Sequence, residues 1–366
     1  MLHEGAAESN RHGDDLAERL LAHLGAAWQA PDLRYSAAPR RMTGGFETSV
    51  FTFAVEGAPA GLDAPMVLRV FSQRPELDRA ALEATVQNTL AAMGYPVPRV
   101  WLFEAGAERL GAPFIVMELA RGSTLVQEFA GLGSGRSPRE LLRLLGRIPS
   151  VFGDLDRMAL LQHRLHQLAP DTLVAKLRDQ GLLDHVTFAG RFERMRRLGA
   201  QAGLVGLTPG IRWLEANQLA ERSPVICHCD FQPFNVLSEK GRVSAVLDWG
   251  NVTIAAAELD VASTVANMSA VPLSVPAPLQ LIFGPLLRLL ARRYAHAYRK
   301  MSALDMYAIR YYQVFRCMMQ LVWVADGVAN SRPSRGIFDS AQGVARLVAR
   351  IRSLSGVEVR FDWKRV

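Results

Sequence analysis

The sequence changes character near residue 120, and this change constrains the fold more than any other feature. Before it, short runs of β-branched and aromatic residues occupy 48–55, 66–71, 99–104 and 113–119. Such runs are typical of strands. After it, long segments with apolar residues at helical spacing dominate. A β-rich part followed by a helical part predicts an α+β fold with two lobes.

The 366 residues are enough for two lobes, because a domain commonly contains about 100–200 residues. We expect a helical lead-in at 1–32, a β-rich lobe at 33–120 and a mainly helical lobe at 121–366. In the lead-in, Asp14 or Asp15 is predicted to cap a helix that continues to about residue 30.

The pattern within each lobe predicts the individual elements. In the small lobe, the runs at 48–55 and 66–71 flank a turn-like segment and predict an antiparallel pair, and 75–94 predicts a helix. In the large lobe, a strand–loop–strand–turn–strand passage at 225–248 interrupts predicted helices at about 137–168, 182–200, 210–220, 277–300, 303–329 and 336–353.

Composition excludes several classes of protein. With 49% hydrophobic and 21% charged residues, the chain is typical of a globular protein. Its net charge of +7 comes from scattered basic residues that are not interleaved with aromatics, so we expect no nucleic-acid partner. Three cysteines cannot form a disulfide framework. The uncharged stretch 261–287 is interrupted by prolines, which disfavours a membrane span. We expect a cytoplasmic protein with no membrane partner.

The stretch HCDFQPFN at 228–235 is the main candidate for catalysis. It matches H-x-D-x-x-x-x-N, and Asp248 follows Asn235 by thirteen residues. Phosphoryl transfer needs a carboxylate that receives or orients the proton of the acceptor hydroxyl, and oxygen ligands for Mg²⁺. Asp230 fits the first role, and Asn235 with Asp248 fits the second. His228 is expected to brace the loop through hydrogen bonds, and a role for it as the base is less favoured.

The same stretch also has a metal-site interpretation, because Cys227, His228, Cys229 and Asp230 are all residue types that bind metals. Structural zinc sites usually use cysteines or histidines spaced farther apart. In a strand, moreover, the two cysteines would lie on the face opposite His228. We therefore favour the cysteines as small apolar residues.

The first lobe supplies residues for binding a nucleotide in the order that phosphoryl-transfer enzymes use. Two glycines before a strand could approach phosphates through their backbone, an arginine in the next strand could replace the phosphate-binding lysine, and a glutamate on the following helix could pair with it. The end of the last strand is similar to a hinge that contacts adenine through backbone groups. The residues are Gly44, Gly45, Arg69, Glu83, Glu118 and Leu119.

Together these motifs resemble the aminoglycoside phosphotransferase and choline kinase branch of the protein-kinase-like fold. Further matches are YPVPRV at 95–100, RLHQL at 164–168 and AAAELDVAS at 255–263, which places Asp260 on the family's supporting aspartate. The resemblance covers about residues 35–265 and implies a small β-rich lobe and a large helical lobe. It departs from the family pattern in having no lysine before Lys176, so Arg69 must take the place of the phosphate-binding lysine.

The resemblance implies a small-molecule kinase that transfers the γ-phosphoryl group of ATP, with Mg²⁺, to a hydroxyl of an aminoglycoside-like or other hydroxylated metabolite. GTP is also possible. From residue 261 onward, five acidic residues stand against fifteen basic ones, which disfavours a polycationic acceptor. The uncharged segment 261–287 favours an apolar or neutral, hydroxylated one. The alternative is a non-catalytic nucleotide-binding module that acts through partners. The oligomeric state is not predicted.

Overall fold

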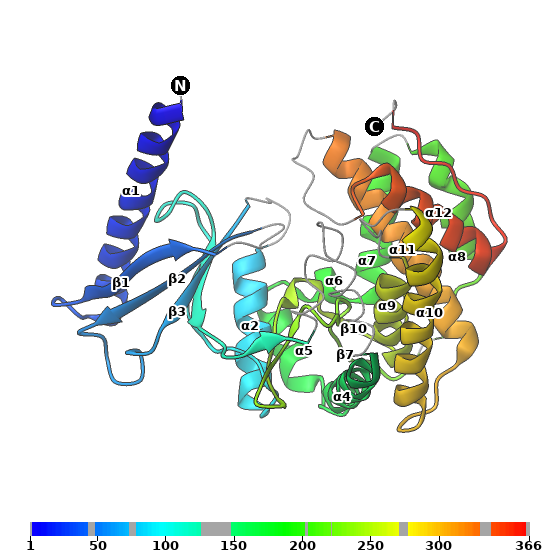
Figure 1. The fold of residues 1–366 in the computed structure, drawn as a ribbon, viewed down its shortest axis with the longest axis horizontal. Coiled ribbons are helices and arrows are strands. Elements are labelled where there is room, and N and C mark those ends of the chain that lie inside the picture. The colour runs from blue at the N-terminus through cyan, green and yellow to red at the C-terminus, as the bar shows by residue number, and fades with distance from the viewer. Residues whose placement is uncertain are drawn as a thin grey trace. The chain divides into compact units, whose positions relative to one another are not determined.

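The computed structural model describes residues 2–42, 48–72, 78–125, 148–201, 204–220, 222–270, 277–329 and 338–363. The chain forms two compact units (Figure 1). The small unit consists of Met1–Arg121 and Ser244–Gly250, and the large unit consists of Gly122–Val243 and Asn251–Val366. The chain therefore returns to the small unit for one short segment late in the sequence.

A five-stranded antiparallel sheet forms the small unit, with strand order β1-β2-β3-β5-β4. The predicted antiparallel pair is confirmed, since β2 and β3 pair directly. The central strand β3 places Arg69 opposite Val50 on one side and Ile115 on the other. The elements are α1 (Leu2–Trp28), β1 (Arg34–Arg41), β2 (Thr48–Glu56), β3 (Met66–Phe71), α2 (Arg79–Ala92), β4 (Val100–Glu104) and β5 (Phe114–Glu118).

Two features of the small unit differ from the sequence prediction. The predicted cap at Asp14 or Asp15 is wrong, because α1 begins at Leu2 and runs through both positions. Strand β1 was not predicted, since its sequence RYSAAPRR lacks the alternation of apolar and polar residues that marks a half-buried strand. The exposure of β1 explains the missing alternation, because none of the residues of this strand is fully buried.

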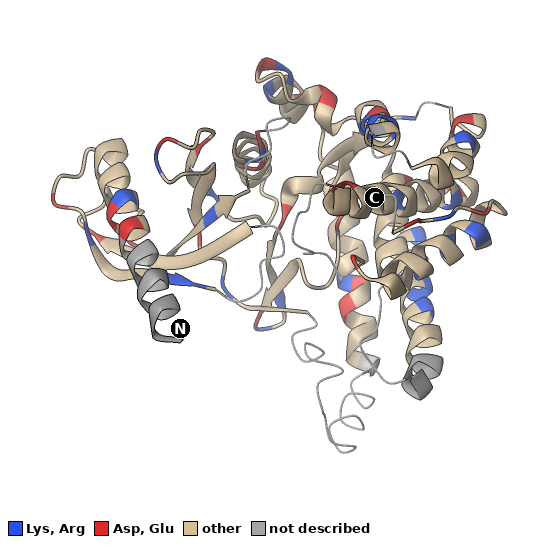
Figure 2. Cartoon of the chain, turned by 90° about the horizontal axis from the view of Figure 1, so that it is seen from above, with Lys and Arg blue, Asp and Glu red and all other residues tan. Residues whose placement is uncertain are grey.

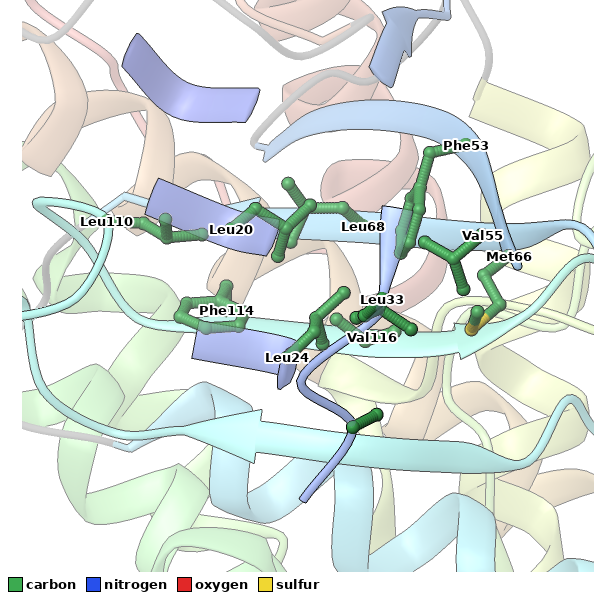
Figure 3. Packing of buried hydrophobic residues seen from close by; sticks show 11 residues of the cluster. Leu20, Leu24, Leu33, Phe53, Val55, Met66, Leu68, Leu110, Phe114 and Val116 are labelled. Atoms are coloured by element: carbon green, nitrogen blue, oxygen red, sulfur yellow. The ribbon is translucent and has the colours of Figure 1, made fainter. Parts of the chain in front are cut away.

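The core of the small unit lies between α1 and one face of the sheet (Figure 3). Leu20 and Leu24 of α1 are fully buried against Leu68, Phe114 and Val116 of the sheet. Their spacing of four residues puts both leucines on one face of the helix. Burial of this face fixes the lead-in helix to the sheet.

The large unit is mainly helical, and its short strands lie in one sheet of order β10-β7 and one of order β6-β8-β9. Strand β6 pairs with β8, and β7 pairs with β10. Strand β9 begins in the large unit and ends in the small one. The elements are β6 (Ser123–Thr124), α4 (Ile148–His166), α5 (Asp171–Asp179), α6 (Leu183–Val186), α7 (Phe188–Gln201), η2 (Val205–Leu207), α8 (Thr208–Ala216), β7 (Val225–Cys227), β8 (Val236–Glu239), β9 (Arg242–Val246), η3 (Trp249–Asn251), β10 (Thr253–Ala255), α9 (Ala257–Ala270), α10 (Ala277–Arg299), α11 (Met306–Ala329) and α12 (Ala341–Ser355).

One predicted helix of the large unit is broken. The segment 182–200 forms α6 and α7, separated by Thr187, which has extended backbone angles. The Thr187 hydroxyl accepts from the N–H of Gly190 at 3.1 Å, as an N-terminal capping side chain does. The predicted helix at 137–168 is described only from residue 148, where α4 begins.

Helices α9 and α11 form the interior of the large unit. Almost every residue of α9 is buried, and α11 buries most of its length against α9, α7 and α12. Within the described ranges, no helix is both long enough and apolar enough to cross a bilayer. Lysine and arginine are spread over several elements (Figure 2).

Two methionines of the small unit test how the sheet is stabilised. Met66 is 1% exposed and Met42 is 44% exposed. We expect Met66→Ala to lower the free energy of unfolding by about 2–5 kcal/mol, because it leaves a cavity in the core. The matched control Met42→Ala should change it by less than about 0.5 kcal/mol. Urea unfolding measures both, and equal losses would contradict the burial described.

Candidate active site

The loop that follows β7 has an unusual backbone, and a buried carboxylate holds it. Cys229 adopts a φ of 60°, a left-handed conformation that is uncommon for residues other than glycine. The backbone N–H groups of His228 and Cys229 donate to the two oxygens of Asp260, at 2.8 and 2.6 Å. Asp260, at the start of α9, therefore fixes the turn that leads into Asp230.

A chain of buried hydrogen bonds supports Asp260 in turn. His166, the last residue of α4, has its Nε2 atom 3.0 Å from Asp260 Oδ2 and its Nδ1 atom 2.6 Å from the Tyr298 hydroxyl. An ionised carboxylate only accepts, so Nε2 donates to Asp260. Burial raises the pKa of Asp260, but the hydrogen bonds and electrostatic interactions with His166 and His228 outweigh it, so the pKa lies below its ordinary value.

The side chain of Asp230 is itself oriented by amide groups. Asn235 donates from Nδ2 to the backbone oxygen of Asp230 at 2.9 Å and to Oδ2 at 3.2 Å. Gln232 and Asn267 donate to Oδ1 at 2.5 and 2.9 Å. The Asp230 side chain is only 15% exposed. The predicted pair Asp230 and Asn235 therefore comes together in one loop, with the carboxylate fixed in position.

Asn267 and Arg316 also lie at this site, although no sequence motif indicated them. Arg316 of α11 lies 3.5 Å from Asp230 Oδ1 and donates from Nε to Asn267 at 3.3 Å. Neither residue belongs to a short motif, since they lie 37 and 86 residues beyond Asp230. Only the packing of α9 against α11 brings them to the loop.

His228 lies where a bracing residue is needed. It is fully buried, and its Nδ1 atom accepts from the N–H of Asp230 at 3.2 Å. Its ring packs edge-on against Phe231, which is also fully buried, with centroids 5.6 Å apart. This geometry is consistent with the predicted bracing role, which remains a proposal.

The cysteines of this segment are buried as free thiols. Strand β7 ends at Cys227, so the expected alternation of side chains does not extend to Cys229, whose backbone is left-handed. Within the described ranges, the metal-ligand atoms of His166, Cys227 and Asp260 lie within 4.8 Å of one another. This is a different set from the four consecutive residues considered above, and His166 and Asp260 already use these atoms in hydrogen bonds.

The small unit contains a second polar group, centred on Arg69 of β3. Its guanidinium contacts Glu83 of α2 at 2.6 Å, Asp248 at 3.0 Å and the Thr48 hydroxyl at 3.2 Å. The predicted pairing of Arg69 with Glu83 is therefore present. Glu83 is fully buried and also contacts Arg79 at 3.4 Å. Burial raises the pKa of Glu83, while Arg69 and Arg79 act in the opposite direction.

Asp248 reaches Arg69 because residues 244–250 pack within the small unit. Val246 donates its N–H to Pro96 at 2.8 Å, and Trp249 is fully buried with its ring edge-on to Tyr95. Asp248 has a φ of 64° and is, like Cys229, one of four non-glycine residues with a positive φ in the described ranges. Such conformations cluster at functional sites, where the surrounding structure must hold them.

The remaining predicted nucleotide-binding residues are only partly described. Gly44 and Gly45 lie outside the described residues. At the predicted hinge, the N–H of Glu118 donates to Arg99 at 2.9 Å and that of Leu119 donates to Pro65 at 3.3 Å. Both N–H groups are thus engaged within the small unit, and the predicted contact with adenine stays a prediction.

The hold of Asp260 on the loop can be tested through stability. We expect Asp260→Asn to lower the free energy of unfolding by about 3–5 kcal/mol at pH 7, because an amide cannot replace a buried carboxylate that accepts several hydrogen bonds. The control Asp179→Asn changes an exposed residue of α5. Urea unfolding measures both variants.

The stability of the wild type should also depend on acid pH in a way that the stability of Asp260→Asn does not. The pKa of Asp260 is lowered in the folded state. Its stabilising contribution is therefore fully present above the unfolded-state pKa of about 3.9 and is lost as the pH falls through the folded-state pKa. The stability difference between wild type and Asp260→Asn should shrink in that acidic range. A difference that stays constant there would contradict an ionised Asp260.

Comparison with known structures places these features in a common fold. A protein of Ralstonia eutropha JMP134, provisionally assigned as an aminoglycoside phosphotransferase, is 18% identical, with a TM-score of 0.59 over 95% of this chain and 97% of that one. Aminoglycoside phosphotransferase APH(4)-Ia is 17% identical, with a TM-score of 0.58 over 92% and 99%. Macrolide 2'-phosphotransferase type I is 16% identical, with a TM-score of 0.54 over 93% and 97%.

These likenesses confirm the predicted α+β, two-lobed, kinase-like fold. A thermostable variant of APH(4)-Ia has also been solved as a ternary complex with ADP and hygromycin B. No curated protein matches the chain.

The family model described as "Phosphotransferase enzyme family" matches residues 39–307, which is well over half of the chain. This match confirms the resemblance to aminoglycoside phosphotransferases that the motifs indicated, and it confirms the prediction of a phosphotransferase. The chain belongs to the phosphotransferase enzyme family.

Proposed function

We propose that the protein is a small-molecule kinase that transfers the γ-phosphoryl group of ATP to a hydroxyl of a small acceptor. The observation that carries this proposal is the oriented carboxylate of Asp230, which Asn235 contacts at 3.2 Å within a loop fixed by Asp260. Family membership supports the reaction class. Each unit forms its own part of the machinery, with the catalytic loop in the large unit and the Arg69 group in the small unit.

Asp230 is proposed to orient the acceptor hydroxyl and to receive its proton. An acceptor hydroxyl is a poor nucleophile. A carboxylate that accepts a hydrogen bond from this hydroxyl directs a lone pair of the hydroxyl oxygen toward the phosphorus. The amide donors around Asp230 stabilise the ionised form and fix its direction. His228 and Asp260 would act by positioning this loop.

The donor set for Mg²⁺ fits that ion. Mg²⁺ prefers hard oxygen ligands, such as carboxylate and amide oxygens. The Nδ2 atom of Asn235 is engaged with Asp230, so its Oδ1 atom is the one that would bind the ion. Asp248 offers a carboxylate that is 39% exposed. When bound, Mg²⁺ would neutralise charge on the nucleotide phosphates.

Arg69 is proposed to bind the nucleotide phosphates in place of a lysine. Glu83 and Thr48 hold its guanidinium from two sides, and a planar guanidinium can pair with phosphate oxygens through two N–H groups. Gly44 and Gly45 would contribute backbone N–H groups, and Glu118 with Leu119 would contact the base. The nucleotide complexes of APH(4)-Ia support ATP as the donor, and GTP stays an alternative.

The proposal assigns a role to each part of the chain. Residues 33–120 would bind the nucleotide, residues 121–366 would supply the catalytic loop and the acceptor site, and residues 1–32 would be a helical lead-in. The hydroxylated acceptor would be the principal partner, without nucleic acid or membrane. The ATP requirement and three free thiols support a cytoplasmic location.

A non-catalytic nucleotide-binding module is the second candidate. The contact between Arg69 and Asp248 at 3.0 Å favours it in one respect, because it occupies both side chains without a ligand. Against it, the loop keeps a strained backbone and a fully oriented Asp230, and a module without catalysis has no need of them.

Asp230→Asn tests the catalytic assignment. We expect it to lower acceptor-dependent ADP release by roughly 10²- to 10⁴-fold, the usual contribution of a positioned base, while ATP binding is retained. The assay covers a panel of hydroxylated acceptors, with Asp179→Asn as the control. Release that survives in Asp230→Asn would sink the mechanism. Mg²⁺-dependent ATP binding without turnover of any acceptor would favour the non-catalytic module.

Asp248→Ala tests the metal assignment through binding alone. ATP with Mg²⁺ should raise the unfolding temperature of the wild type, because a ligand at about 100 times its Kd stabilises by about 2.7 kcal/mol. We expect this shift to be lost in Asp248→Ala and kept in Asp63→Ala, an exposed aspartate of the same unit. A full shift in Asp248→Ala would show that Asp248 is not a ligand of the metal.

A further inference from the structure

Arg316 gives the proposed catalytic carboxylate a cationic neighbour that the phosphoryl-transfer motifs do not contain. Its Nη2 atom lies 3.5 Å from Asp230 Oδ1, beyond an optimal charge-assisted hydrogen bond. Asn267 instead donates to the same oxygen at 2.9 Å. The guanidinium therefore lies beside Asp230 without being locked onto it.

The position of Arg316 is fixed by contacts away from Asp230. Its Nε atom donates to Asn267 at 3.3 Å, and its guanidinium lies over the Trp323 ring, 5.5 Å from the centroid. The side chain is 11% exposed. A guanidinium anchored through Nε and through one face keeps its Nη groups for a partner with the geometry of a carboxylate or phosphate.

A second cation, Arg191, lies close enough to Arg316 for their charges to interact. Arg191 of α7 donates from Nη2 to the backbone oxygen of Val252 at 2.9 Å, and its buried Nε atom lacks a hydrogen-bond partner in the described part of the chain. Burial lowers the pKa of Arg191 to about 10, and the nearby charge of Arg316 acts in the same direction. The two arginines therefore raise the local positive potential together.

Carboxylates do not balance this charge. Across the described ranges, Asp230 is the carboxylate within ion-pair distance of Arg316, and Arg191 has none. In these ranges, the one carboxylate paired with Arg316 is thus Asp230, whose chemistry in the proposed reaction is directed at the acceptor hydroxyl. From residue 261 onward, basic residues outnumber acidic ones, so the net charge of this part of the chain is also positive.

We infer that the acceptor carries an anionic group, a carboxylate or a phosphate, which pairs with Arg316 while the hydroxyl of the acceptor meets Asp230. The inference rests on the proposed function, because it places the acceptor at Asp230. Arg316 is then a specificity-determining residue, and the charge of Arg191 adds to the positive potential near it. A bound anion would supply the charge that these two arginines lack.

The opposing interpretation is that Arg316 only neutralises Asp230 in the resting enzyme. The two interpretations differ in a measurable way. If Arg316 serves Asp230 alone, its removal changes kcat/KM for every acceptor by the same factor. If it binds an acceptor anion, removal affects anionic acceptors selectively.

The experiment compares matched alcohols that differ in charge. The anionic probes are glycerate, 4-hydroxybutyrate and glycerol 3-phosphate, and the neutral probes are glyceramide, 4-hydroxybutyramide and glycerol. Choline and an aminoglycoside are the cationic probes. ADP release with ATP and Mg²⁺ gives kcat/KM, and ligand-observed NMR gives binding without turnover. The anion that is preferred, carboxylate or phosphate, identifies the group.

We expect wild type to favour anionic over neutral probes, and Arg316→Gln to lower kcat/KM for the anionic probes by roughly 10- to 100-fold, the worth of a charge-assisted hydrogen bond. Neutral probes should change by less than about threefold. Arg316→Lys should recover part of the preference. Arg310→Gln, an exposed arginine of the same helix, is the matched control, and thermal unfolding shows that each variant folds.

The outcomes separate the inference from the function on which it rests. Turnover of neutral or cationic probes without an anionic preference overturns the inference and leaves the kinase intact. Selective binding of anions that Arg316→Gln abolishes, without ADP release from any probe, supports the anion site and overturns the kinase. Absence of any anionic preference in both assays overturns the inference, as does an equal loss for all probes in Arg316→Gln.

Discussion

The two backbone hydrogen bonds that Asp260 accepts from His228 and Cys229 are the interaction on which the proposed catalytic loop depends. A left-handed cysteine is costly by itself, and an ionised carboxylate buried in the protein is costly by itself. In this structure the two features stabilise each other, because the turn presents two adjacent N–H groups to one carboxylate. His166 and Tyr298 complete the hydrogen bonding from α4 and α10. The direction of Asp230 is therefore set by the helical core of the large unit.

The small unit uses the same principle with the charges reversed. Arg69 is a partly buried cation whose partners come from three separate segments, namely Thr48 of β2, Glu83 of α2 and Asp248. Asp248 has a left-handed backbone, which the burial of Trp249 and the contact of Val246 with Pro96 maintain. In both units, a left-handed residue is held by the contacts around it, through the carboxylate of Asp260 in the large unit and through Trp249 and Val246 in the small unit.

Sequence could predict the residues whose role lies in a local pattern. The loop at 228–235, Asp248, the pairing of Arg69 with Glu83 and the strands β2 and β3 follow from spacing and alternation, and the structure contains the contact and the strands. Strand β1 and the break at Thr187 were missed, since one lacks alternation and the other depends on a single capping hydroxyl. Asn267 and Arg316 at Asp230, and Tyr298 at His166, could not be predicted, because only helix packing brings them to these contacts.

This division between local pattern and packing separates reaction from specificity. The groups proposed for phosphoryl transfer lie in short motifs, where spacing along the chain sets their positions. The residues beside Asp230 on the acceptor side come from α9 and α11 instead, and a helix can change its side chains without disturbing the loop. A neutral or apolar acceptor was the expectation from composition. The position of Arg316 beside Asp230 argues for an anionic one, because a charge held beside the carboxylate that is proposed to react counts for more than an average over the lobe.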